Sequence, residues 1–270
     1  MIDFQKIREQ HHSLNDKCVK CQTEVWPCEV ITVLDEFELF IKKMKFNLNF
    51  STGLEVDKQQ TTLWDATNTA EMMLQKNKDL FMFAASYRFT YNGPSDILNA
   101  GYFHLKYRSH YKDKFQPEPF VQYQFDNKRG LEMRAIAGAN IRYNMWRGDK
   151  IEFNAGLGLM NEIERWDYAG VDSTKWPLNQ TPITKNYIKI NSYVRMDWKA
   201  NENSDLAISV FFQTRPDSFH PRIAPHFQWN LNAGKHVGFS MSFSGMYDES
   251  PIVPIHHFYY SLSNSITLKF

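Results

Sequence analysis

The sequence predicts an all-β fold, an antiparallel transmembrane β-barrel of about twelve strands over residues 45–270, preceded by a short helical or irregular segment, residues 1–44. Three observations lead to this prediction. From Lys45 to the last residue, apolar and polar side chains mostly alternate with a period of two. No run of about 18 apolar residues occurs, so no transmembrane helix is expected. Aromatic residues make up 15% of the chain, as suits the interfacial belts of a membrane barrel.

The alternation is clearest from Glu132 to Asn144. One face of this stretch carries only Met, Ala, Ile and Tyr, and the other carries Glu, Arg and Asn with one Ile and one Gly. Residues 151–159, 188–198 and 237–244 repeat the pattern. Such long alternation is typical of a strand whose two faces meet different solvents.

Counting these runs gives twelve predicted strands: 45–56, 60–74, 79–91, 97–110, 115–126, 131–145, 149–165, 184–200, 204–215, 221–232, 235–247 and 256–270. The end of the second strand, residues 70–74, also fits a helix by composition. Many runs exceed the 9–11 residues or so that a tilted strand needs to cross a bilayer. The long connection 166–183 and the tight turn Arg147-Gly148-Asp149 match the long loops and short turns of outer-membrane barrels.

A soluble barrel or sandwich is the alternative, and the polar face argues against it. That face is rich in Gly, Ser and charged residues, which are too small or too polar to fill a dry core. Aromatic residues gather at strand ends, among them Phe89, Tyr91 and Trp166, as in interfacial belts. The chain closes on Phe270 at the end of a strand, which resembles the signal that the outer-membrane insertion machinery reads.

The first 44 residues have a different chemistry. Cys18, Cys21 and Cys28 together with His12 (or His11) could supply a Cys₃His set for Zn²⁺, with three free thiols as the alternative. Residues 30–37 carry a helical apolar stripe. No secretory signal is visible in this segment, which conflicts with an exported barrel and suggests a fusion or a misassembled reading frame.

Several motifs of the barrel region resemble a known family. These are Phe46-Asn47-Leu48-Asn49-Phe50-Ser51-Thr52-Gly53, Asn99-Ala100-Gly101-Tyr102-Phe103, Arg134-Ala135-Ile136-Ala137-Gly138-Ala139-Asn140-Ile141 and Ala155-Gly156-Leu157-Gly158. They resemble the YdiY-like, or salt-induced, outer-membrane barrels of the Bacteroidetes type. The resemblance implies the fold and a Gram-negative outer-membrane location, and it brings no catalytic residues. Residues 1–44 resemble instead a short cysteine-rich segment of actinobacterial or phage origin.

The polar face predicts a ladder of charges inside the barrel: Glu132, Arg134, Arg142, Glu152, Lys189, Arg195 and Asp197. One interpretation is a set of ion pairs that fills and stiffens the lumen, and the other is a narrow or anion-selective constriction. The formal net charge is +1 and no basic block occurs, so nucleic acid is not an expected partner.

The sequence was searched for residue types that could form a catalytic arrangement. A lipid hydrolase could use His256 or His257 with Ser261 and Asn264. A protease at the barrel rim would need paired acids with an Asp–His couple, and no second pair accompanies Asp217, His220 and His226. No phosphate-binding glycine loop is present. The sequence therefore favours a non-enzymatic outer-membrane protein, structural or a narrow channel for small solutes, with the bilayer and the insertion machinery as partners. An outer-membrane lipid hydrolase and a soluble ligand-binding barrel are the alternatives.

Overall fold

The computed structural model describes residues 13–14, 17–18, 44–58, 62–92, 95–234 and 237–268. The chain divides into two compact units, one of residues 1–47 with 74–77 and one of residues 48–73 with 78–270. In the smaller unit, β1 and β2 pair antiparallel, with Ser13 opposite Cys18 and Leu14 opposite Lys17.

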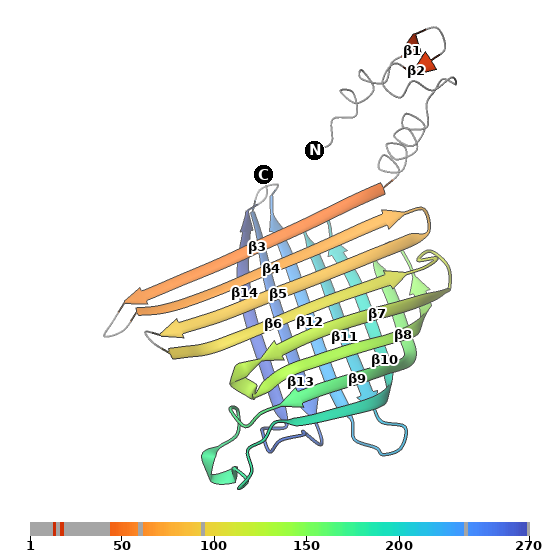
Figure 1. Cartoon of the computed structure of the whole chain (residues 1–270). Coiled ribbons are helices and arrows are strands. Elements are labelled where there is room, and N and C mark those ends of the chain that lie inside the picture. The colour runs from red at the N-terminus through yellow and green to blue at the C-terminus, as the bar shows by residue number, and fades with distance from the viewer. Residues whose placement is uncertain are drawn as a thin grey trace. The chain divides into compact units, whose positions relative to one another are not determined.

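Strands account for nearly all of the described secondary structure (Figure 1). Their bounds are β1 Ser13–Leu14, β2 Lys17–Cys18, β3 Met44–Lys58, β4 Thr62–Lys76, β5 Asp79–Asn92, β6 Ser95–Arg108, β7 Phe115–Asp126, β8 Leu131–Arg147, β9 Ile151–Trp166, β10 Ile183–Asn201, β11 Ser204–Thr214, β12 Arg222–Ala233, β13 Val237–Asp248 and β14 Phe258–Leu268. Two short 3₁₀ turns, η1 Asn127–Arg129 and η2 Ser173–Lys175, lie in the connections.

The twelve strands from β3 to β14 form one sheet in which each strand pairs with its sequence neighbours. No ladder among the described residues joins β3 to β14. Within the larger unit the sheet curls into a half-barrel (Figure 1). The prediction of an all-β antiparallel fold with about twelve strands is confirmed. Each predicted strand boundary lies within two residues of the observed one, and residues 70–74 are strand rather than helix.

Two ends of the half-barrel differ in their connections. One end carries the connections 127–130, 167–182, 215–221 and 249–257, and we call it the loop end. The opposite end carries the connections 109–114, 148–150 and 202–203, and we call it the turn end. At the loop end, Gly130 has a φ of 76°, a conformation that glycine adopts without steric cost. Its carbonyl accepts a hydrogen bond of 2.8 Å from the backbone N–H of Asp167, which ties two of these connections together.

The distribution of polar and apolar side chains over the two faces of the sheet is the reverse of that in a soluble protein. On the outward face, Leu157 and Leu159 are 61% and 59% exposed, whereas Glu162 on the inner face is 0% exposed. The strand register places the charged residues of neighbouring strands on the same inner face, with Arg134 opposite Glu164. The sheet therefore buries polar side chains and exposes apolar ones.

Candidate functional site

Six charged side chains on the inner face form what we call the loop-end cluster: Arg134, Glu162, Glu164, Lys189, Arg222 and Asp248. They come from β8, β9, β10, β12 and β13, in the strand halves nearest the loop end. Three are cations and three are carboxylates, so the cluster is electrically balanced.

Arg222, the first residue of β12, is the centre of the loop-end cluster. Its Nη1 lies 2.9 Å from Glu162 Oε1 and 2.8 Å from Glu164 Oε1. Its Nη2 lies 2.6 Å from Asp248 Oδ2. The guanidinium thus meets three carboxylates while Arg222 is only 5% exposed. Charges removed from water in this way are tolerated because each one is paired.

Glu162 receives two further cations. Arg134 Nη2 lies 2.6 Å from Glu162 Oε1, and Lys189 pairs with the other carboxylate oxygen. Arg134 also donates a 3.2 Å hydrogen bond to Gln213 Oε1 on β11. With Gln213 included, these side-chain contacts link six strands, β8 to β13, which the backbone ladder also joins.

The contact between Arg222 and Glu162 requires a curled sheet. β10 and β11 separate β12 from β9. In a flat sheet these two strands would lie about 14 Å apart, three times the usual strand spacing. The 2.9 Å ion pair is made because the sheet curls its charged face inward.

An apolar plug covers the loop end of the clustered strands. It consists of buried Leu131, Trp166, Val171, Val253 and Ile255. Val171 belongs to the β9–β10 connection, and Val253 and Ile255 belong to the β13–β14 connection. These long loops therefore pack against the loop ends of β8 and β9.

Arg129 of η1 joins the plug to β14. Its guanidinium lies 4.4 Å from the ring centre of Tyr259 and 5.6 Å from that of Trp166. Burial lowers the pKa of Arg129, and nearby Asp126 partly offsets that effect. Trp166, predicted for an interfacial belt, lies instead inside the plug.

Rings and glycines fill the middle of the inner face. Phe120, Ile136 and Met160 form a small buried group. A Cβ atom at Gly156 would overlap the ring of Tyr193, so glycine makes room for that ring. The Tyr193 hydroxyl donates to Glu118 on β7, three strands away.

A second set of charges, the turn-end cluster, lies toward the other end: Lys106, Arg108, Glu118, Arg142, Arg147, Glu152, Arg195 and Asp197. Arg108 Nε lies 2.5 Å from Glu118 Oε1, and Arg195 Nη2 lies 2.5 Å from Asp197 Oδ1. Unlike Arg222, Arg195 has a side chain that is 38% exposed.

The predicted charge ladder divides between these clusters. Arg134 and Lys189 lie in the loop-end cluster, while Arg142, Glu152, Arg195 and Asp197 lie in the turn-end cluster. Glu132 is the exception and corrects the prediction, because it pairs with Arg165 at 2.5 Å. A register shift between Leu131 and Met133 changes the face that simple alternation assigns to Glu132.

Sequence reasoning missed several members of the clusters. Glu162 and Glu164 lie an even number of positions from Glu152 on β9, and so on the same face of the sheet. Arg222 lies on the same face of β12 as His226 for the same reason. Extending the alternation to the strand ends would have placed these residues on the inner face. Glu118 was hidden because Pro117 and Pro119 flank it in a strand of mixed composition.

The residues proposed for hydrolysis do not converge. Ser261 pairs with Ser244 and Asn264 with Met241, so the first lies on the inner face of β14 and the second on the outward face. His257 Nδ1 lies 2.8 Å from the backbone oxygen of Asp248.

The residues proposed for a rim protease are likewise dispersed. Asp217 bonds Arg215, which lowers the pKa of the carboxyl group. His220 Nδ1 lies 3.8 Å from Glu249, and His226 Nδ1 lies 3.0 Å from the hydroxyl of Ser244.

The remaining predicted sites lie mostly outside the described residues. Of the zinc candidates, Cys18 lies in β2, whereas His12, Cys21 and Cys28 are not among the described residues. Phe270 also lies outside them. The zinc site and the insertion signal stay predictions.

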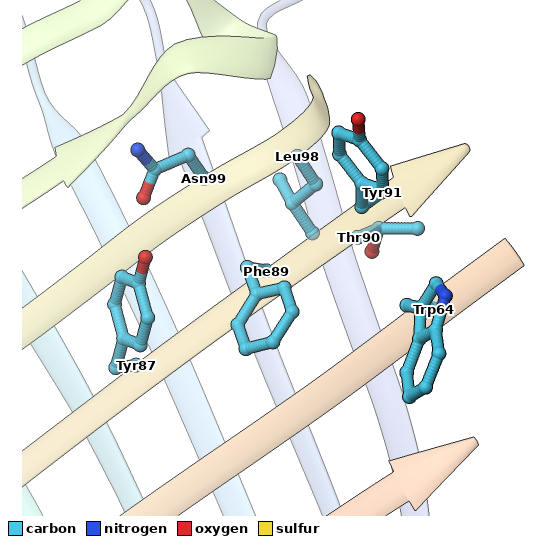
Figure 2. Close-up of a pocket in the computed structure, with 7 residues that line it drawn as sticks. All are labelled: Trp64, Tyr87, Phe89, Thr90, Tyr91, Leu98 and Asn99. Carbon is cyan, nitrogen blue, oxygen red and sulfur yellow. The ribbon is translucent and has the colours of Figure 1, made fainter. Parts of the chain in front are cut away.

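An aromatic pocket of about 520 Å³ lies near the loop end of β4, β5 and β6 (Figure 2). Trp64, Tyr87, Phe89, Tyr91 and Leu98 supply its apolar walls. The alternating residues of β5 bring their rings to the outward face, which places the predicted strand-end aromatics Phe89 and Tyr91 together. Such walls suit hydrocarbon rather than a charged substrate.

None of the described residues belongs to a helix long and apolar enough to span a membrane. No protein-family model, curated protein or solved structure matches this chain.

Proposed function

We propose that this chain is a non-enzymatic β-barrel protein of the bacterial outer membrane, of the YdiY-like kind. The observation that carries the proposal is that the sheet exposes apolar side chains on its outward face and buries charged ones on its inner face. Leu157 and Leu159 on the outward face are more than half exposed, while Glu118 and Glu162 on the inner face are fully buried. Water would penalise that outward face, whereas the hydrocarbon core of a bilayer would match it.

Within this proposal the lumen has a structural role or passes small solutes only. The loop-end cluster and the apolar plug occupy one end of the half-barrel. An open porin would instead need a water-filled lumen. In planar bilayers we expect conductance far below that of a porin, and large, stable porin-like steps would contradict the narrow lumen.

Hydrolysis of lipids is not favoured, because Ser261 and Asn264 lie on opposite faces of β14. A phospholipid-turnover assay of the purified protein tests this point directly. Turnover that Ser261→Ala abolishes would restore the hydrolase hypothesis.

A charge placed on the outward face tests the membrane proposal. Leu157→Arg should lower the free energy of unfolding from lipid by about 2–4 kcal/mol, because the guanidinium would enter hydrocarbon. Leu178→Arg is the matched control, since Leu178 is fully exposed in the β9–β10 connection. Unfolding in urea from vesicles gives both values.

The wild-type protein should also need detergent to stay monodisperse and should migrate differently on gels before and after heating. A protein that is monodisperse without detergent, with Leu157→Arg no more harmful than Leu178→Arg, would end the proposal in favour of a soluble barrel.

A further inference from the structure

The turn-end cluster has more cations than the residues around it balance. It contains five cations and three carboxylates, whereas the loop-end cluster contains three of each. Glu71 on β4 is a further carboxylate, near His226. Cations remain in excess when Glu71 is counted.

Each carboxylate of the turn-end cluster already has its own partners. Glu118 accepts from Arg108 and from the hydroxyl of Tyr193. Glu152 lies 3.2 Å from both Arg142 and Arg147. Asp197 is held by Arg195 through two hydrogen bonds, to Nε at 2.8 Å and to Nη2 at 2.5 Å.

Lys106 is the cation left over. No carboxylate of the described residues lies within ion-pair distance of its Nζ, and the closest recorded partner is the ring of Tyr193, at 5.8 Å from the ring centre. The carboxylate of Glu118 acts on Lys106 from beyond ion-pair distance, against the like charges of Arg108, Arg142 and Arg195. In addition, Nε of Arg142 is buried and has no hydrogen-bond partner among the described residues, in a side chain that is only 4% exposed. Partly or fully buried cations in excess of the nearby carboxylates are costly, which favours an external anion.

Arg195 keeps a partly open side chain, 38% exposed, in this cluster. Its neighbours across the inner face are Ser209 on β11, then His226 and Ser244. Ser244 is exposed and carries a hydroxyl group that can donate a hydrogen bond, whereas Ser209 is buried. At the turn end the connections 148–150 and 202–203 are short, whereas the plug lies at the opposite end.

From this arrangement we infer that the turn-end half of the lumen binds a small oxyanion of the phosphate or sulfate type, held by Lys106 and Arg195. The inference rests on the proposed function only for the side of the membrane from which the anion enters. The anion would contribute the missing negative charge, and its oxygens would accept hydrogen bonds from the ammonium and guanidinium groups.

Equilibrium dialysis of the purified full chain against labelled inorganic phosphate, in phosphate-free maltoside micelles, tests the inference. We expect saturable binding of one phosphate per chain. Lys106→Gln with Arg195→Gln should weaken binding by about tenfold or more, since two charge-assisted contacts are lost. Arg215→Gln is the matched control, because Arg215 forms an ion pair with Asp217 in the β11–β12 connection outside the cluster.

If the double variant does not fold, the single variant Arg195→Gln is tested for phosphate binding in its place. This variant should fold, because Arg195 is partly exposed and its loss leaves no deeply buried charge unpaired. Binding that is not saturable, or that is equal in wild type and Arg195→Gln, would overturn the inference. Displacement of phosphate by a short-chain phosphatidic acid at lower concentration than by sulfate would support the same site with a lipid headgroup as its source. Because the assay reads binding in detergent, its failure is distinct from a failure of the membrane proposal.

Discussion

The loop-end and turn-end clusters use the same residue types on overlapping strands, yet they are built differently. At the loop end, Arg222 and Glu162 are almost fully buried, and every charge has an opposite partner. At the turn end, Arg195 is partly exposed and Lys106 has no carboxylate partner among the described residues. Burial raises the energetic cost of an unpaired charge, so the deeper cluster is balanced and the more open one retains spare cations.

This difference separates two roles within one lumen. The loop-end cluster joins strands that are not ladder neighbours, such as β9 and β12, and it supports the plug above it. The turn-end cluster keeps charged groups accessible, as recognition of a solute requires. Substitutions at matched positions in the two clusters can therefore distinguish stabilisation of the barrel from binding of a solute.

The largest expected effect is at Arg222. Arg222→Leu should cost about 3–5 kcal/mol of unfolding free energy, because it leaves three carboxylates short of a cation in a buried place. Arg195→Leu should cost about 1 kcal/mol or less, as expected for a partly exposed ion pair. Urea unfolding from vesicles gives both values, and similar losses for the two variants would remove the distinction between the clusters.

A smaller effect is expected at the boundary between the clusters. Gly156→Ala should cost about 1–3 kcal/mol, because the added methyl group would displace the ring of Tyr193 and with it the hydrogen bond to Glu118. Gly53→Ala is the control, since an added Cβ there would come no closer than 3.9 Å to a neighbouring atom, the backbone oxygen of Thr67. The prediction would be wrong if both variants unfolded at the same urea concentration.

Much of the fold follows from the sequence because alternation is a local property. The polarity of each residue in a strand indicates the face of the sheet on which it lies. All twelve strands and the inner position of Arg134 could therefore be predicted from periodicity. Glu132 could not, because a register shift within a strand has no comparable signal in the residues around it.

The partners that lie on strands that are not neighbours in the sheet could not be predicted. Arg222 meets Glu162 across two intervening strands, and only the curvature of the sheet creates that contact. The alternation of polar and apolar residues could place Arg222 and Glu162 on the inner face, but it gives no distance between two side chains across the lumen. The plug was missed for a similar reason, since Val253 and Ile255 lie in a loop without periodicity and pack against Trp166 far away in the chain.

The smallest of these effects concerns the link between the plug and β14. Arg129→Leu should cost about 0.5–2 kcal/mol, because it removes the cation that stacks on Tyr259 and Trp166 but retains an apolar side chain. Lys128→Leu is the matched control, as Lys128 is the exposed neighbour in the same 3₁₀ turn. Limited proteolysis should cut the 167–182 connection faster in Arg129→Leu than in Lys128→Leu, since the plug would open more often. If the rates are equal, the loop end is held by its apolar contacts and ion pairs alone, and the bracing role belongs to the loop-end cluster without help from Arg129.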